Sequence, residues 1–126
     1  MKIIRSSDLE FVPASHEHTK SPGVLKKILL YNEDIMNGDV QMINWALLPA
    51  GRSFQAHYHE DMEEIFIILK GRVKIIIDGE EAILETGDTV VVPMMCVHTM
   101  DNAEFEDVEY IVVGVSLGRN GKTMVV

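Results

Sequence analysis

Cysteine is almost absent from this sequence of 126 residues, in which Cys96 is the only one. An internal disulfide is therefore excluded, and we expect a reducing, cytoplasmic compartment. A chain of this length can fold as one domain without such a crosslink, because it buries roughly two-thirds of its unfolded surface. The sequence also has no apolar run at its start that is typical of a signal peptide, and no stretch of roughly 18 apolar residues that could span a membrane.

Positive charge is scarce as well. Eleven Lys and Arg residues stand against 20 Asp and Glu residues, which gives a formal net charge of −9. Nucleic acids and anionic membrane surfaces are bound through clustered Lys and Arg, so this charge balance argues against both as partners. A small molecule is the expected partner.

The pattern of a long amphipathic helix is missing too. Short apolar runs alternate with Gly, Asn and Asp turn signals such as Asn37-Gly38-Asp39 and Asp78-Gly79, which is typical of an all-β sandwich or barrel. The runs predict strands at 24–31, 41–48, 65–70, 73–77, 81–84, 89–92, 98–102, 108–116 and 123–126.

We expect a single domain over residues 1–126, with N-terminal strands in 1–40, a barrel in 41–116 and a tail in 117–126. Strands near the N-terminus leave an unpaired sheet edge, which a second copy of the chain could cover. We therefore predict a homodimer in which the N-terminal strands are candidates for exchange.

Metal-binding side chains are concentrated between Gly51 and Asn102. In an extended strand His57 and His59 point the same way, with Tyr58 opposed, so two imidazoles lie side by side. Several acids follow, and Glu64 is the best third ligand because alternation places it on the inward face with Phe66, whereas Glu63 faces the other way and is the reserve. With His98 the set is three imidazoles and one carboxylate, which suits a divalent transition metal such as Mn, Fe, Ni, Zn or Cu.

These residues carry a resemblance to a known family. Gly51, His57, His59, Glu64 and Gly71 match the first motif of the cupins, and Gly87, Pro93, His98 and Asn102 match the second, with Met95 where a glycine is usual. The resemblance implies a small antiparallel β-barrel or jelly roll, also called a double-stranded β-helix, and a metal held by the three histidines and Glu64. It leaves the reaction open, because cupins include oxygenases, decarboxylases, isomerases and non-catalytic proteins.

Our first hypothesis is a metal-dependent enzyme of the oxygenase or decarboxylase type that acts on a small oxygenated, anionic organic acid. The alternative is a non-catalytic binding or sensing module with a structural metal. Sugar isomerisation or epimerisation ranks below both, because the predicted pocket mouth shows little Lys or Arg for a phosphate clamp.

The pocket wall and several solitary residues complete the sequence-based predictions. We expect the substrate to contact four residues, namely Gln55, Phe66, Met100 and Asn102. Cys96 is either a small buried hydrophobe, which is its usual role, or an additional soft ligand. His16 and His18 also have His-x-His spacing, but no further ligand accompanies them, so we expect both on the surface.

Overall fold

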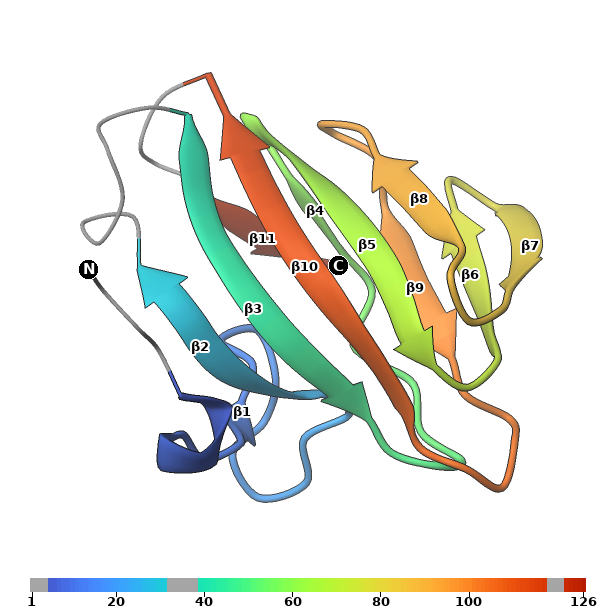
Figure 1. Ribbon diagram of the computed structural model, residues 1–126. Helices are drawn as coiled ribbons and strands as arrows, with labels where there is room; N and C mark the ends of the chain where they lie inside the picture. Colours follow the sequence, from blue (N-terminus) through green and yellow to red (C-terminus); the bar gives the residue numbers. More distant parts are fainter. Residues whose placement is uncertain (1–4, 32–38, 118–121) are drawn as a thin grey trace.

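The computed structural model describes residues 5–31, 39–117 and 122–126, and nearly all regular structure in them is strand (Figure 1). A single 3-10 turn, η1, spans Ser6–Asp8. The strands follow in chain order: β1 Val12–Pro13, β2 Leu25–Tyr31, β3 Val40–Leu48, β4 His57–His59, β5 Met62–Lys70, β6 Val73–Ile77, β7 Glu80–Leu84, β8 Thr89–Val92, β9 His98–Asp101, β10 Val108–Ser116 and β11 Thr123–Val125.

Two antiparallel sheets face each other. One has six strands in the order β1-β2-β3-β10-β5-β8, and the other has five in the order β11-β4-β9-β6-β7. Figure 1 shows β3, β10 and β5 running side by side in front, with β4, β9 and β11 behind them. The predicted all-β jelly roll is confirmed.

The core lies between the sheets because each strand alternates inward and outward side chains. In β10 buried and partly exposed residues alternate over all nine positions. The largest fully buried apolar side chains come from both sheets, and they are Leu48, Ile68, Ile75, Met100, Val92 and Val108. This alternation directs the inward side chains of both sheets into one interior.

Most predicted strands are found within a residue or two of their expected bounds, with three differences. β5 begins at Met62 rather than at Ile65, so Glu64 lies inside the strand, and the short strands β1 and β4 were not predicted as separate elements. The turn at Asp78-Gly79 has positive φ at both residues, as a tight hairpin requires. The turn predicted at Asn37-Gly38 and the loop 118–121 lie outside the described residues.

The N-terminal strands pair within their own chain. β2 runs antiparallel to β3 over most of its length, and β1 pairs with the first two residues of β2. Exchange of these strands between two chains stays a prediction.

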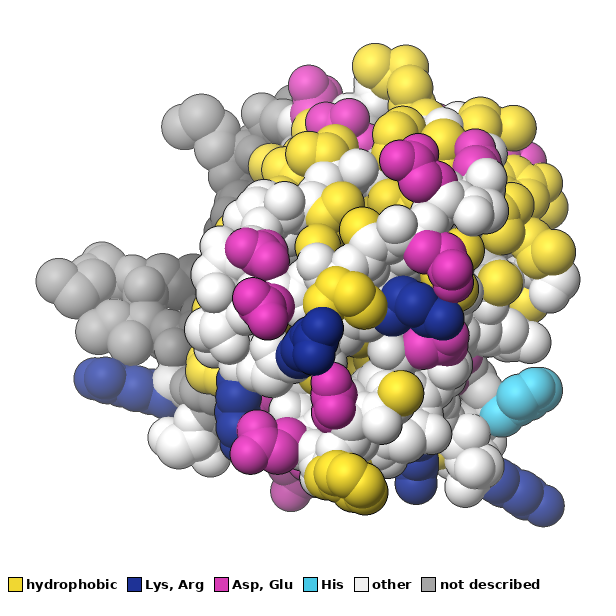
Figure 2. Space-filling view, turned by 90° about the vertical axis from the view of Figure 1, so that its right-hand side faces the viewer, with side chains coloured by type: hydrophobic (Ala, Val, Ile, Leu, Met, Phe, Trp, Pro, Cys, Tyr) yellow, Lys and Arg dark blue, Asp and Glu magenta, His cyan; other side chains and the backbone are white. Residues whose placement is uncertain are grey.

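Charged and hydrophobic side chains are interspersed on the side of the molecule formed by β6 and β7. Figure 2 shows acidic and basic groups next to one another on this side. Lys74 Nζ lies 3.1 Å from a carboxylate oxygen of Glu81 and 3.7 Å from one of Asp101. Solvent screens exposed pairs of this kind, so they contribute little to stability.

Candidate metal centre

Three histidines and one glutamate meet between the two sheets. His57 and His59 lie on β4, and His57 is directly opposite His98 of β9 in the five-stranded sheet. Glu64 reaches the same point from β5 of the six-stranded sheet. One ligand atom from each residue lies within 4.8 Å of the others, and all four residues are buried. The predicted ligand set is thus brought together by residues from both sheets.

The outer ring nitrogens of the three histidines are each held by a neighbour. His57 Nδ1 lies 2.7 Å from the carbonyl oxygen of Gln55, and His98 Nδ1 lies 3.0 Å from that of Cys96. His59 Nδ1 lies 3.1 Å from the hydroxyl of Thr123 on β11. Partners at Nδ1 fix the ring orientation of a metal-binding histidine and leave Nε2 for the metal.

The Nε2 atoms of His59 and His98 converge on the Glu64 carboxylate. Oε1 of Glu64 lies 2.9 Å from His59 Nε2 and 3.2 Å from His98 Nε2. Both ring nitrogens of His98 therefore face oxygen acceptors, although a neutral imidazole has only one N–H to donate. A cation at Nε2 would resolve this conflict, because Nδ1–H then donates to Cys96 and the Nε2 lone pair faces the metal.

The surroundings of His57 and Glu64 favour the charge states in which these side chains can bind a metal ion. Burial, followed by the nearby His16 and His98, lowers the pKa of His57 to about 3, so this imidazole is neutral at physiological pH. Burial alone would raise the pKa of Glu64, but hydrogen bonds from His59 and His98 outweigh it and hold that pKa below its usual range. A neutral imidazole and an ionised carboxylate are the forms that bind a divalent ion. The residues present fit such an ion.

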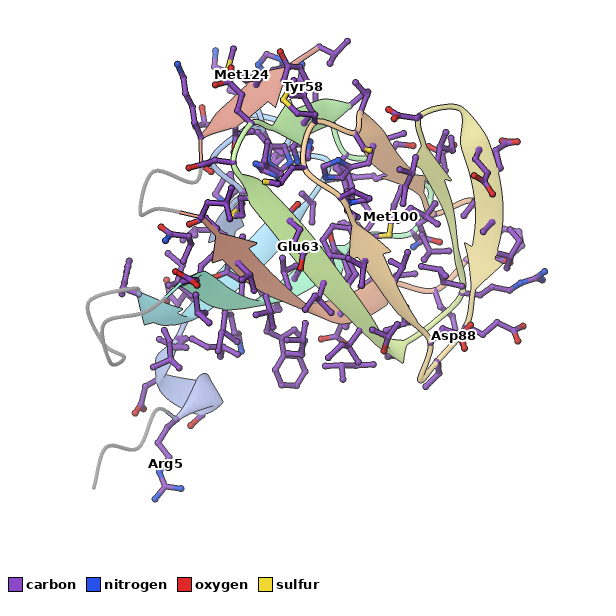
Figure 3. The ribbon with its side chains drawn as sticks, turned by 90° about the horizontal axis from the view of Figure 1, so that it is seen from above. Arg5, Tyr58, Glu63, Asp88, Met100 and Met124 are labelled. Atoms are coloured by element: carbon purple, nitrogen blue, oxygen red, sulfur yellow. The ribbon has the colours of Figure 1, made fainter. Side chains whose placement is uncertain are left out.

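The alternation of side chains along β4 and β5 correctly predicts which neighbours of the metal ligands point away from the site. Glu64 is 6% exposed, whereas the side chain of Glu63 is exposed. Tyr58 is opposite Met124 in the pairing of β4 with β11, away from the ligands, and Figure 3 shows the two residues close together. Cys96 contributes its carbonyl to His98 but is not among the four clustered ligands.

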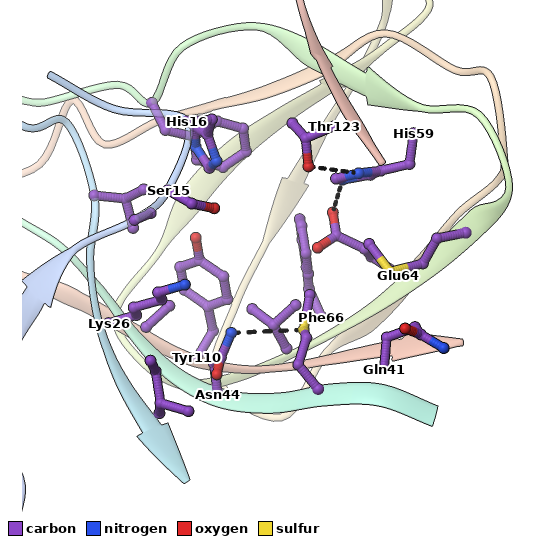
Figure 4. A pocket seen from close by; sticks show the side chains of 18 of the residues that line it. Ser15, His16, Lys26, Gln41, Asn44, His59, Glu64, Phe66, Tyr110 and Thr123 are labelled. Atoms are coloured by element: carbon purple, nitrogen blue, oxygen red, sulfur yellow. Dashed lines mark hydrogen bonds and ion pairs between the residues drawn. The ribbon is translucent and has the colours of Figure 1, made fainter. Parts of the chain in front are cut away.

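A pocket of about 350 Å³ opens beside the metal ligands (Figure 4). Phe66 lines it, as predicted from its position next to Glu64 on the inward face. The other three predicted contact residues do not line this pocket. Gln55 lines a separate surface depression together with Glu17, Met100 packs in the core with no exposed area, and Asn102 ties down a loop at the other end of the barrel.

His16 lies in this pocket, and the prediction that it is a surface residue is wrong. Its ring stacks on His57 with a centroid distance of 4.0 Å, and its Nε2 is buried without a hydrogen-bond partner. His18 is exposed, as expected. The His-x-His spacing gave no sign of this difference, because residues 14–24 form irregular chain rather than a strand.

Glu17 explains how the irregular segment reaches the metal ligands. Its buried carboxylate accepts hydrogen bonds from the backbone N–H groups of Gly23, Val24 and Gln55 at 2.7, 3.1 and 3.1 Å. Gln55 in turn holds the ring of His57 through its carbonyl oxygen. These hydrogen bonds, called the Glu17 clamp below, hold the segment that carries His16 and the residues that precede His57.

Lys26 was not predicted as a pocket residue, although a single cation agrees with the expectation of little Lys or Arg at the pocket mouth. It lines the pocket from β2 and is the one Lys or Arg among the described pocket residues. Arg52, by contrast, donates to the carbonyl oxygen of Pro22 on the surface. The pocket therefore has a cationic side chain in addition to the metal ligands.

Comparisons with known proteins agree with this geometry. A family model described as a cupin domain matches residues 44–114. An uncharacterized protein of Methanocaldococcus jannaschii is 30% identical over 102 residues, which cover 81% of this chain and 78% of that protein. In the described part of the chain, no helix has the length and apolar character needed to cross a membrane.

Two solved structures share the arrangement of strands. A predicted oxalate decarboxylase of Thermotoga maritima is 26% identical with a TM-score of 0.80, and the match covers 92% of this chain and 100% of that one. A sugar phosphate isomerase of Silicibacter pomeroyi is 18% identical with a TM-score of 0.73, covering 90% of this chain and 75% of that one. The second likeness concerns the fold alone.

Proposed function

This chain belongs to the cupin family, and from that premise we propose that it is a cytoplasmic, metal-dependent enzyme of the oxygenase or decarboxylase type. Its substrate is a small oxygenated organic acid. The observation that carries the proposal is the convergence of three imidazoles on one buried carboxylate, with both ring nitrogens of His98 facing acceptors, at the wall of a pocket.

A divalent ion held by His57, His59, Glu64 and His98 would act as a Lewis acid on the oxygens of a bound acid. Neutral imidazoles and one carboxylate cancel only one of the two positive charges of such an ion, so the loaded site attracts an anion. The aromatic rings of Phe54 and Phe66 border the histidines and give this part of the pocket an apolar wall. Manganese, iron, nickel, zinc and copper all accept this donor set.

The Thermotoga maritima protein supports the decarboxylase type, because it is described as a predicted oxalate decarboxylase and its whole length aligns with this chain. A sugar phosphate substrate is less favoured. Phosphate is usually bound by several Lys or Arg side chains, and Lys26 is the one that lines the described pocket. A non-catalytic binding module is the remaining alternative.

The first test is elemental analysis of untagged protein, with His98→Ala as the variant and His18→Ala as its control. We expect near-stoichiometric transition metal in the wild type and in His18→Ala, because His18 is exposed and is not among the clustered ligands. The His98→Ala protein should lose the metal. Metal-free wild type that takes up no added ion would contradict the proposal.

Turnover is the second part of the test. Small organic acids are incubated with the loaded protein, with and without oxygen, and loss of the acid and release of carbon dioxide are measured. Product formation that depends on the metal supports the enzyme. Tight binding of an acid without turnover would favour the binding module instead.

We further propose that the protein forms a homodimer through the outer face of the six-stranded sheet. Two rows of apolar side chains cross this face in register. Trp45, Ile111 and Ile67 form one row, and Ile43, Val113, Ile65 and Val91 form the other. Outward positions of a sheet are polar when they face water, so apolar residues at these positions favour a covered face.

Light scattering tests this proposal against the chain mass of 14.2 kDa. We expect twice this mass for the wild type, and the single-chain mass for Ile111→Lys, which places a charge in the centre of the face. The control Ile83→Lys, at an exposed position on β7, should stay dimeric. A single-chain mass for the wild type at micromolar concentration would refute the dimer.

A further inference from the structure

The pocket contains a second polar group besides the metal ligands. It consists of the Lys26 ammonium, the Tyr110 hydroxyl and the Asn44 amide, which line the pocket from β2, β10 and β3. Figure 4 shows these three side chains together on the side of the pocket opposite His59 and Glu64. All three side chains are positioned by strands of the six-stranded sheet and none by a loop.

Strand register explains why these residues meet. Lys26 pairs with Ala46, and Ala46 pairs in turn with Tyr110, so the lysine and the tyrosine flank one small residue on the inward face. Asn44 is the next inward residue along β3. Glu64 lies on β5, three strands from β2, which corresponds to roughly 14 Å across the sheet at ~4.8 Å per strand.

Asn44 and Lys26 have few partners of their own among the described residues. Asn44 is 6% exposed and its Oδ1 has no hydrogen bond, while its Nδ2 contacts only the sulfur of Met42 at 3.5 Å. Lys26 makes no ion pair with any described residue. Burial lowers the pKa of its ammonium group, and the negative charge of Glu64 partly opposes this shift. Buried polar atoms are almost always satisfied in folded proteins, so the unpaired Asn44 Oδ1 beside the Lys26 ammonium favours a ligand at this wall of the pocket.

The wall between the two polar ends is apolar. Ala46, Val112, Phe66 and Met42 line the pocket between Lys26 and the metal ligands. A two-carbon diacid would fill only a small part of the pocket volume of about 350 Å³. The shape and polarity together call for a longer molecule that is polar at both ends.

We propose that Lys26, Tyr110 and Asn44 form a second subsite that binds the distal carboxylate of an extended diacid, whose 2-hydroxy or 2-oxo acid end is held at the metal. The proposal rests on the proposed function, because the first end requires the metal. It goes further by naming the substrate class as a diacid longer than oxalate. The ammonium supplies the charge, the hydroxyl and amide N–H supply hydrogen bonds, and the apolar wall packs on the carbon chain.

A matched pair of ligands tests the second subsite. 2-Hydroxyadipate and 2-hydroxyhexanoate have the same six carbons and the same chelating end, and differ in the distal carboxylate. Their affinities for the metal-loaded protein are measured by calorimetry, and the metal content of every sample is determined first. The variants are Lys26→Met and Tyr110→Phe, and the control is Lys27→Met, which removes the next lysine of β2 on the opposite face.

We expect the wild type and Lys27→Met to bind the diacid about 10- to 100-fold more tightly than the monoacid, as one charge-assisted hydrogen-bond network allows. In Lys26→Met the preference should disappear while affinity for the monoacid changes less than about threefold. Tyr110→Phe, which removes one oxygen, should reduce the preference partially. The monoacid therefore reports whether each variant keeps an intact metal end.

Two results would overturn the second subsite. One is equal binding of the two acids, or binding of neither, by wild-type protein that contains metal. The other is a preference for the diacid that persists in Lys26→Met. Wild-type protein that binds no metal would instead refute the proposed function, and the second subsite with it, so the metal analysis separates the two failures.

Discussion

Asn102 is the last residue of the second cupin motif. It could either contact the substrate or stabilise the fold. Its side chain is 1% exposed. Nδ2 donates to the carbonyl oxygens of Leu48 and Glu106 at 3.1 and 2.8 Å, and Oδ1 accepts from the N–H of Glu104 at 3.1 Å. One amide thus joins the loop before β10 to the end of β3.

We predict that Asn102→Ala destabilises the protein without affecting metal binding. Three hydrogen bonds are lost, each contributing about 1 kcal/mol net, and buried partners left unpaired increase the cost. The expected loss is about 3 kcal/mol. For a domain of this size that corresponds to a decrease in Tm of roughly 10 °C.

Urea unfolding and calorimetry measure the loss, and elemental analysis follows the metal. The matched control is Glu104→Ala, which keeps the backbone N–H that Asn102 accepts from and removes only an exposed side chain. It should change stability by less than about 0.5 kcal/mol. A loss below about 1 kcal/mol in Asn102→Ala, or loss of metal from a variant of unchanged stability, would refute the structural role of this residue.

Three further predictions concern the pocket and its approaches. In metal-free protein, the pKa of His57 is lowered from 6.5 to about 3, so the unfolded state binds more protons between these two pH values. The free energy of unfolding should therefore fall as the pH decreases below 6.5, by up to about 1.4 kcal/mol per pH unit. Urea unfolding in the presence of a chelator should show a weaker pH dependence of stability in His57→Gln. Gly23→Ala should cost about 2–3 kcal/mol and loosen the Glu17 clamp, because a Cβ there overlaps the Ser53 carbonyl and the Glu17 carboxylate; a Tm equal to that of the wild type would contradict this. Met95→Val should destabilise by about 1–2 kcal/mol relative to Met95→Gly, because φ at this residue is 66° and a β-branched side chain opposes it; equal unfolding midpoints would argue against strain.

The candidate metal centre could be predicted because most of its determinants are local. His57 and His59 share a face by strand alternation alone, and the same alternation selects Glu64 over Glu63. His98 comes from a different strand, and only its motif spacing associates it with the others before the pairing of β4 with β9 is known. The turn before it tolerates Met95 in place of glycine by placing this exposed methionine in the left-handed conformation.

The pocket wall could not be predicted because it depends on strand register. β2 reads Leu-Lys-Lys-Ile-Leu-Leu-Tyr, with no alternation that says which lysine faces inward. The pairing of Lys26 with Ala46 decides this, and a slip of one residue would turn Lys27 into the pocket instead. The position of His16 depends on a still less local cause. The Glu17 carboxylate accepts hydrogen bonds from the backbone N–H of Gly23 in its own segment and from that of Gln55. Three of the four candidate metal ligands, His57, His59 and Glu64, are therefore specified within a few positions of one another, whereas the pocket wall is specified by contacts between distant segments.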